Sequence, residues 1–239
     1  MIYIIVFSSF QVSFSERTIQ NNTILSTQSL NFSDIIFKPD SKPYNVTYSD
    51  WTAKWWQWAY SIPLDKHPAY DDDGRYCGQN QHQPVWFFPG SYEHPVVRTC
   101  EIPANTALLI TILNSECSFA DYSSLTTEDE LRDCATKIQD TVSGVHASLD
   151  GVDIPNLENY RVQSNLFNFT LPENNILNLP PQTTQAVSDG NWLFIKPLPP
   201  GTYELKFKGD LLNSVNNTDE EFAGPFGWDQ ETTYILHIK

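Results

Sequence analysis

Hydrophobic and polar positions alternate along much of the chain from residue 84 onward. In "GTYELKFKG" (201–209) an apolar side chain recurs at every second position, with a charged one between. This period of two is typical of a strand with one face in a core. The same alternation occurs in "NLFNFTL" (165–171) and in "VHASLDGVDI" (145–154), where Asp150 and Gly151 predict a tight hairpin turn.

Shorter apolar runs lie between these segments. "PVWFFPG" (84–90) and "VVRTCEIP" (96–103) are bounded by Pro or Gly, and "ALLITIL" (107–113) is apolar throughout, as in a strand buried on both faces. No fixed repeat occurs, which argues against a propeller or solenoid. The pattern predicts a mostly β protein, a β-sandwich of jelly-roll or immunoglobulin-like type with a Trp-rich N-terminal helix and one inserted amphipathic helix.

The first of these helices is predicted over residues 49–60, with Ser49 as N-cap and Pro63 ending it. Its aromatic residues cover more than half of the helix circumference, while Lys54 and Gln57 lie on the solvent side. The aromatic positions fall on two neighbouring faces: Trp51, Trp55 and Trp58 on one, Trp56 and Tyr60 on the other.

The second helix begins at "TTEDELRDCATK", where Thr127 and Glu130 form a capping box. Cys134 lies on its apolar stripe, so that Cys117 can meet it. The chain has four cysteines and no C-x-x-C pair, which favours a disulfide framework in an exported protein over a zinc site. Three pairings are possible. The pairing Cys77–Cys100 and Cys117–Cys134 is favoured, and four free thiols in a cytosolic protein are the alternative.

The N-terminal part is expected to lie outside the sandwich. Residues 1–16 are apolar and then small and polar, like a secretory signal without its basic start, and too short to span a bilayer. A misassigned start or a buried strand are the alternatives. Residues 17–46 read as a polar arm and residues 47–239 as a single sandwich domain. Sequons that predict glycosylation of a secreted or cell-surface protein occur at Asn21, Asn31, Asn45, Asn168 and Asn216.

Charge narrows the range of partners. The 239 residues carry a net charge of −15, with 14 basic against 29 acidic side chains. Such a surface repels phosphate backbones and anionic lipid headgroups, so nucleic-acid binding is not expected.

The tryptophan helix has three interpretations. Packing onto the sandwich is favoured; a sugar-stacking platform and a membrane-interface anchor are the alternatives, and the anchor lacks basic residues. The faces need not share one role, because one can be core while the other lines a cleft. Ligand-binding candidates are Trp56, Gln57, Tyr60, Gln81, Trp86 and Asn114.

Acidic residues supply the remaining candidate chemistry. Glu116, at the end of a strand, is a candidate acid or base with Asp189 as partner; ordering of loops by these carboxylates is the favoured alternative. Asp71 and Asp73 are candidate calcium ligands, although a solvated turn is favoured and no cofactor is firmly expected.

Several segments in order carry a resemblance. They are "WWQWAYSIP", "CGQNQHQPVWFFPG", "RTCEIPANTALLITILNSEC" and "SDGNWLFIKPLPPGTYELKFKG". Together with "SLDGV" and "YRVQS", they make residues 49–239 resemble a group of exported β-sandwich proteins from bacteria and archaea. The resemblance implies architecture and export but no activity.

The leading functional hypothesis is binding of an extracellular glycan or envelope component without turnover. It would use exposed aromatics and polar side chains from the loops 70–92 and 114–122. A carbohydrate-active hydrolase or lyase using Glu116 and an Asp is the runner-up, and a structural cell-envelope subunit is the third candidate.

Overall fold

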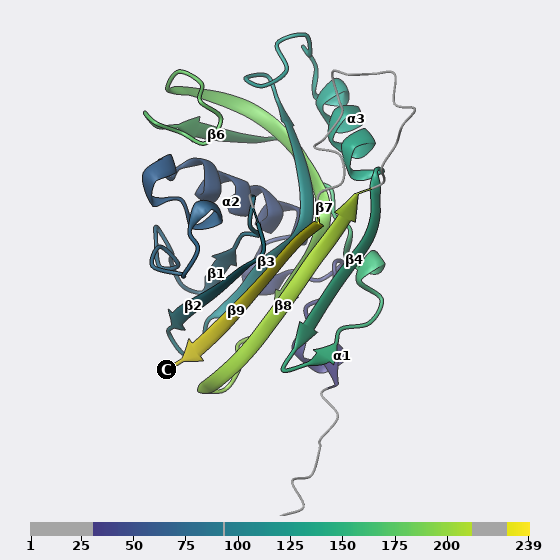
Figure 1. Cartoon of the computed structure of the whole chain (residues 1–239). Coiled ribbons are helices and arrows are strands. Elements are labelled where there is room, and N and C mark those ends of the chain that lie inside the picture. The colour runs from purple at the N-terminus through teal and green to yellow at the C-terminus, as the bar shows by residue number, and fades with distance from the viewer. Residues whose placement is uncertain (1–30, 93, 212–228) are drawn as a thin grey trace, which may run out of the picture. The chain divides into compact units, whose positions relative to one another are not determined.

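The computed structural model describes residues 31–239 except residues 93 and 212–228. Within this part of the chain, nine strands form two sheets (Figure 1). One sheet has the order β1-β3-β7-β6 and the other the order β2-β9-β8-β4-β5. The strands are β1 (Val85–Phe88), β2 (Val96–Ile102), β3 (Ala107–Ser118), β4 (Val142–Leu149), β5 (Val152–Asp153), β6 (Phe167–Leu171), β7 (Gln182–Ile195), β8 (Gly201–Leu211) and β9 (Asp229–Ile238).

Helices are few among the described residues. The α-helices are α1 (Phe32–Ile35), α2 (Tyr48–Tyr60) and α3 (Glu128–Gln139), and the 3-10 helices are η1 (Pro43–Asn45), η2 (Leu64–Lys66), η3 (Pro68–Tyr70) and η4 (Leu157–Tyr160). The structure therefore confirms a mostly β protein with two sheets in a sandwich-like arrangement. No helix in the described part has both the length and the apolar character needed to cross a bilayer.

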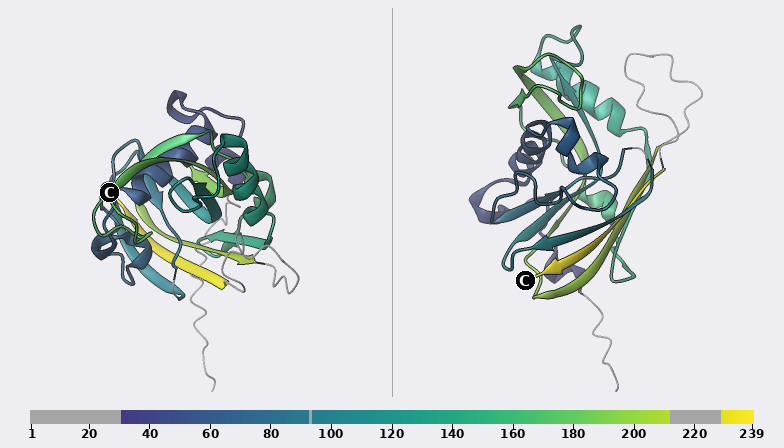
Figure 2. Two further views of the ribbon diagram at one scale, coloured as in Figure 1. Left: turned by 90° about the horizontal axis from the view of Figure 1, so that it is seen from above. Right: turned by 60° about the vertical axis from the view of Figure 1, so that its left-hand side comes forward.

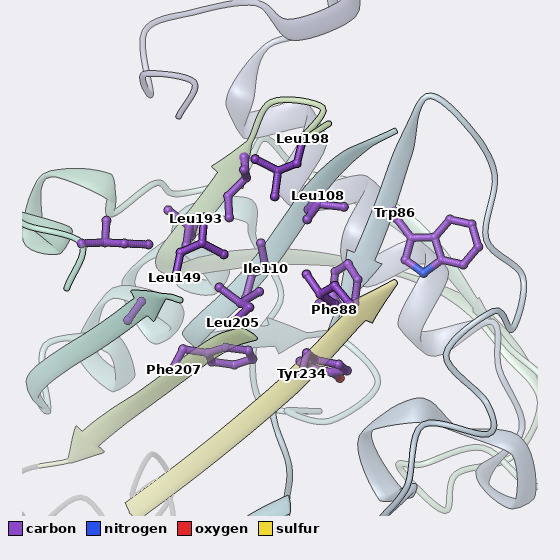
Figure 3. Close-up of a cluster of buried hydrophobic side chains, with 14 of the residues drawn as sticks. Trp86, Phe88, Leu108, Ile110, Leu149, Leu193, Leu198, Leu205, Phe207 and Tyr234 are labelled. Atoms are coloured by element: carbon purple, nitrogen blue, oxygen red, sulfur yellow. The ribbon is translucent and has the colours of Figure 1, made fainter. Parts of the chain in front are cut away.

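The main core lies between the two sheets. Leu108, Ile110 and Leu193 from β3 and β7 meet Leu205 and Tyr234 from β8 and β9 (Figure 3). The alternation expected in β8 is confirmed, because Leu205 and Phe207 are buried and Glu204 is exposed. The Asp150–Gly151 hairpin is also confirmed between β4 and β5.

β3 and β7 are the longest strands of their sheet. The C-terminal half of β3 and the N-terminal half of β7 pair with each other and extend beyond the sandwich core. A bulge between Thr111 and Leu113 shifts the register of β3 against β7 at this point. Beyond the bulge, α2 and α3 lie on opposite sides of the β3–β7 ribbon (Figures 1 and 2). Successive residues of the ribbon therefore face different helices.

Both disulfides predicted from the sequence, Cys77–Cys100 and Cys117–Cys134, are present. The second fixes α3 to β3 one residue after Glu116. The capping box of α3 at Thr127 is confirmed, whereas the N-cap of α2 is Thr47 and not Ser49, because the Thr47 side chain accepts the N–H of Asp50. Two disulfides and a β-rich fold agree with an extracellular protein; glycosylation and the signal segment stay predictions.

The predicted polar arm over 17–46 ends earlier than expected. From residue 31 onward the chain belongs to the same compact unit as the sandwich. Phe32 and Ile36 enter the core, and the Phe37 N–H donates to the Phe194 carbonyl at 2.8 Å. Apolar side chains within "FSDIIFKP" outweigh the polar composition of the segment. Residues 1–30, with the predicted signal and Asn21, lie outside the described residues, as does Asn216.

Candidate functional site

The tryptophan helix α2 packs on the outer face of the β3–β7 sheet. Its four Trp side chains are 1 to 7% exposed, and Lys54 and Gln57 face solvent as predicted. The ring centroid of Trp55 lies 5.5 Å from that of Trp192 in β7, and the ring centroid of Tyr60 lies 4.5 Å from that of Phe169 in β6. The packing interpretation is therefore confirmed. Trp56 and Tyr60 are buried with the others and do not form an open stacking surface.

The interface between α2 and the sheet also contains polar atoms. Among the described residues, six buried side-chain nitrogen and oxygen atoms have no hydrogen-bond partner. Buried polar atoms are bonded in the large majority of cases, so this set is an exception that a polar ligand or ordered water can satisfy. We call these residues the polar cluster: Trp56 on α2, Thr111, Asn114 and Glu116 on β3, and Ser188 and Trp192 on β7.

Strand register brings the members of the polar cluster to one face. Thr111 pairs with Trp192, and Glu116 pairs with Ser188. Between these pairs, Gly190 lies opposite Asn114, and a Cβ at Gly190 would come 2.4 Å from the Asn114 Cβ and 3.0 Å from the Trp192 Nε1. A glycine is required there because any side chain would occupy the middle of the polar cluster.

Glu116 is the acidic centre of the polar cluster. Its Oε2 accepts the Tyr60 hydroxyl at 2.6 Å, while Oε1 is buried and unpartnered. Burial raises the pKa of Glu116 to about 8, and the charge of nearby Asp121 adds to the shift. The pKa of Tyr60 is raised well above its usual value, by burial first and by Glu116 second. At neutral pH the Glu116 side chain is therefore mostly a neutral carboxylic acid.

A small cavity adjoins the polar cluster. It measures about 30 Å³ and is lined in part by Trp55, Tyr92, Thr111 and Asn114. This volume admits a water molecule or a single hydroxyl group but not a sugar ring. Tyr92 and Asn114 are both half-buried, so the cavity lies close to the surface.

Two tyrosines stack at this surface. Tyr92 and Tyr70 have ring centroids 5.2 Å apart and an interplanar angle of 23°. Tyr70, at the end of η3, is 38% exposed. Burial raises the pKa of Tyr92, and the charges of Tyr70 and Glu116 add to this effect. We call Tyr70, Tyr92 and Asn114 the mouth of the polar cluster. The segments 70–92 and 114–122, predicted as loops, include β1 and the end of β3.

Asp189 is not the partner of Glu116. It pairs in register with Ser115, and its side chain lies on the α3 side of the ribbon, where Arg161 binds it at 2.8 Å. Glu116 points to the α2 side, toward Tyr60. The proposed Glu116–Asp189 pair is therefore wrong, because neighbouring positions in paired strands point to opposite faces. The carboxylate beside Glu116 is Asp121.

The other candidates serve local structure. Gln57 donates to the Asn168 carbonyl at 2.8 Å, Gln81 bonds both backbone groups of Phe87, and Trp86 belongs to the main core. In the segment with the candidate calcium ligands, Asp71 accepts the N–H groups of Asp73 and Tyr76, and Asp73 binds Arg75. Across residues 31–239, gaps aside, no group of three His, Cys, Asp or Glu side chains is placed to hold a metal ion. The sequon residues Asn31, Asn45 and Asn168 are exposed.

Several residues of the site were not found by sequence reasoning. Ser188 and Trp192 lie on β7, a strand that was not predicted, and Thr111 was read as one more position of an apolar run. Tyr70, at the end of η3, and Tyr92 and Asp121, in loops, come close to β3 only through the tertiary fold, which no local sequence pattern predicts. The only available signal was the grouping of Asn114 and Glu116 at a strand end.

No family model and no curated protein matches this sequence. Among solved structures, the chain is similar to PbICP-C in complex with falcipain-2, at 11% identity over 65% of this chain and 98% of that one, with a TM-score of 0.25. The cysteine protease inhibitor EhICP2 from Entamoeba histolytica matches at 12% identity over 65% and 96%, with a TM-score of 0.24. Amebosin matches at 8% identity over 61% and 96%, with a TM-score of 0.19. Similarity at these scores supports no inference about this protein.

Proposed function

We propose that this protein binds an extracellular glycan, or another hydroxyl-rich component of a cell envelope, without turnover at the mouth of the polar cluster. The observation that carries the proposal is the set of six unpartnered buried atoms between α2 and one face of the β3–β7 ribbon, where Thr111 and Asn114 line the small cavity. They include N–H donors, hydroxyl groups and a carboxyl oxygen. A ligand hydroxyl both donates and accepts, so it complements this mixture better than an anion or a cation would.

The mouth supports recognition of a ring. The cavity beneath it is limited to the size of one hydroxyl group, so the ligand ring would remain outside. The exposed part of Tyr70 offers an aromatic face there, held by its stack on Tyr92. Pyranose rings present apolar faces to such aromatics, while their hydroxyls reach polar groups such as the Asn114 amide.

Titration with soluble polysaccharides, followed by tryptophan fluorescence and calorimetry, tests this proposal. Saturable binding is expected, and Tyr70→Ala should weaken it about tenfold through loss of the stacking face. Tyr44→Ala is the matched control, because Tyr44 is 40% exposed but lies in η1 against Trp51. A flat response across neutral and acidic polysaccharides, or equal losses in both variants, would remove glycan binding from consideration.

A second candidate, acid catalysis, is favoured by one observation. Burial keeps Glu116 protonated at neutral pH, as a general acid requires. However, the carboxylate near Glu116 is Asp121, whose charge raises the pKa of Glu116, whereas the two carboxyl groups of a glycosidase stand roughly 5 to 9.5 Å apart on either side of the bond that is cleaved. Glu116→Gln should therefore preserve binding. If the wild type shows a measurable turnover that this variant loses, the catalytic hypothesis would be favoured over binding without turnover.

Two broader points belong to the same proposal. The pairs β1–β3 and β2–β9 are parallel, whereas the immunoglobulin and jelly-roll types are both built from antiparallel sheets, so the strand pairing favours neither type over the other. Export, and membership of the exported bacterial and archaeal group that the sequence resembles, agree with the two disulfides and with a glycan as ligand.

A further inference from the structure

A second, larger cavity lies away from the polar cluster, on the α3 side of the ribbon. It is a groove of about 620 Å³. Its floor is the run 142–146 of β4, and its walls are the C-terminal end of α3 at Asp140 and the segment of Glu158 and Arg161. Its volume lies within the range of ligand-binding clefts.

The floor of the groove is an open strand edge. The Asp150 N–H donates to the Glu204 carbonyl in β8. Along an antiparallel strand, the backbone N–H and C=O groups of successive residues point alternately toward and away from the neighbouring strand. Those of Val145 therefore point away from β8. On that side, Ala147 accepts the Ile154 N–H, but within the described residues no hydrogen bond reaches Val145. β5 pairs only with Ser148 and Leu149, so it covers just the end of β4.

The three other long edges each carry a covering contact. The Gln81 side chain donates to the Phe87 carbonyl at 2.7 Å and accepts its N–H at 2.9 Å, which covers β1. The Thr99 N–H of β2 donates to the Asp73 carbonyl at 3.0 Å. Gln57 bonds the Asn168 carbonyl of β6. β4 is covered in the same way only near its end, at Ala147 to Leu149, so its run around Val145 lies uncovered inside the groove. Native proteins cover edges because an open one pairs with other chains, so this run is a candidate site for an added strand.

The charge of the groove favours one kind of occupant. Arg161 binds Asp140 at 2.7 Å and Asp189 at 2.8 Å, so its positive charge is compensated, and Glu158 is exposed at the same wall. His146, on the floor, has Asp210 at 3.7 Å. The groove is therefore acidic. A second copy of this chain, with its own net charge of −15, is repelled, whereas a basic segment is attracted.

We propose that the groove binds an extended basic peptide segment, which adds as a strand to the open edge of β4. Its backbone pairs with Val145, and a Lys or Arg side chain reaches Glu158 or Asp140. This mode takes affinity from main-chain hydrogen bonds and specificity from side-chain contacts. The site is separate from the polar cluster and does not depend on glycan binding.

The test uses the capped peptide Lys-Thr-Val-Thr-Arg-Thr-Val-Thr-Lys and the amide resonances of the protein. Saturable shifts centred on Val145 are expected below about 1 mM peptide. The same peptide N-methylated at two consecutive central residues, which lacks donors on both edges, should bind at least tenfold more weakly. Added salt should weaken binding of the unmodified peptide.

Val145→Pro should weaken binding similarly, because it removes an N–H that points into the groove but spares the β8 ladder. Val97→Pro is the matched control: Val97 lies two residues before Thr99 on the outer edge of β2 and is 63% exposed. Binding that is unchanged by N-methylation would overturn the proposal even if Val145→Pro failed to fold. Absence of saturable binding, or self-association through β4 in place of peptide binding, would overturn it too.

Discussion

Replacement of Glu116 by Gln should make the protein less sensitive to alkaline pH. The buried carboxyl has a pKa of about 8 in the folded protein, against an ordinary value of 4.5. Between these two values the folded state holds a proton that the unfolded state has released. The free energy of unfolding therefore falls as the pH rises from about 4.5 to about 8. A glutamine of the same shape still accepts the Tyr60 hydroxyl but cannot ionise.

The size of the effect follows from the shift. A difference of about 3.5 pKa units corresponds to nearly 5 kcal/mol, at about 1.4 kcal/mol per unit. Relaxation and water entry on ionisation reduce this value, so we expect Glu116→Gln to gain roughly 2 to 5 kcal/mol over the wild type between pH 4.5 and 8.5. His67, whose pKa is lowered to about 4 mainly by burial, affects stability between pH 4 and 6.5 but is common to both proteins.

Denaturant unfolding at closely spaced pH values, with both disulfides intact, measures this difference. The two proteins should have similar stability near pH 4.5, and the variant should become progressively more stable above it. Glu173→Gln, at an exposed position in the loop after β6, is the control and should follow the wild type. Parallel pH profiles for wild type and Glu116→Gln would refute the buried neutral carboxyl.

Three further outcomes are expected. Gly190→Ala should cost roughly 1 to 3 kcal/mol, because its Cβ meets the Asn114 Cβ at 2.4 Å. Gly78→Ala, whose Cβ would lie 3.9 Å from the Trp86 ring, should be tolerated in the same unfolding assay. Replacing Cys117 and Cys134 together by Ala should lower the melting temperature through loss of roughly 3 kcal/mol, and an unchanged melt would contradict a structural role for this link. Arg98→Lys should lower the free energy of unfolding by about 3 kcal/mol, because the buried guanidinium binds the carbonyls of Ala69, Asp71 and Pro89 and the Tyr234 hydroxyl. Equal stability of the two proteins would show that a single positive charge at this position is sufficient.

Local chemistry made much of the fold predictable. The alternation in β8, the turn at Asp150 and Gly151 and the capping box at Thr127 each depend on a few neighbouring residues. Cys134 could be paired with Cys117 because the helix period placed it on an inward face. β7 was missed because "QTTQAVSDGNW" has no consistent period of two: residues 186–192 are all buried, and Gly190 is fixed by its close approach to Asn114.

The candidate site was predictable only in part. The sequence identified four residues as candidates for binding or catalysis, and the fold brings them together: Trp56, Tyr60, Asn114 and Glu116. Their partners could not be predicted, because register and face decide them. Asp189 lies next to Ser188 in sequence, yet Ser188 faces Glu116 and Asp189 faces Arg161.

The most direct test of the ligand site uses the indole N–H resonances of the tryptophans. Trp56 and Trp192 have unpartnered indole nitrogens in the polar cluster, whereas those of Trp58 and Trp86 donate to the carbonyls of Gln79 and Cys77. Addition of a bound polysaccharide should shift the indole signals of Trp56 and Trp192 and leave those of Trp58 and Trp86 in place. Shifts confined to Trp58 or Trp86, or none under conditions where calorimetry detects binding, would contradict a ligand site at the polar cluster.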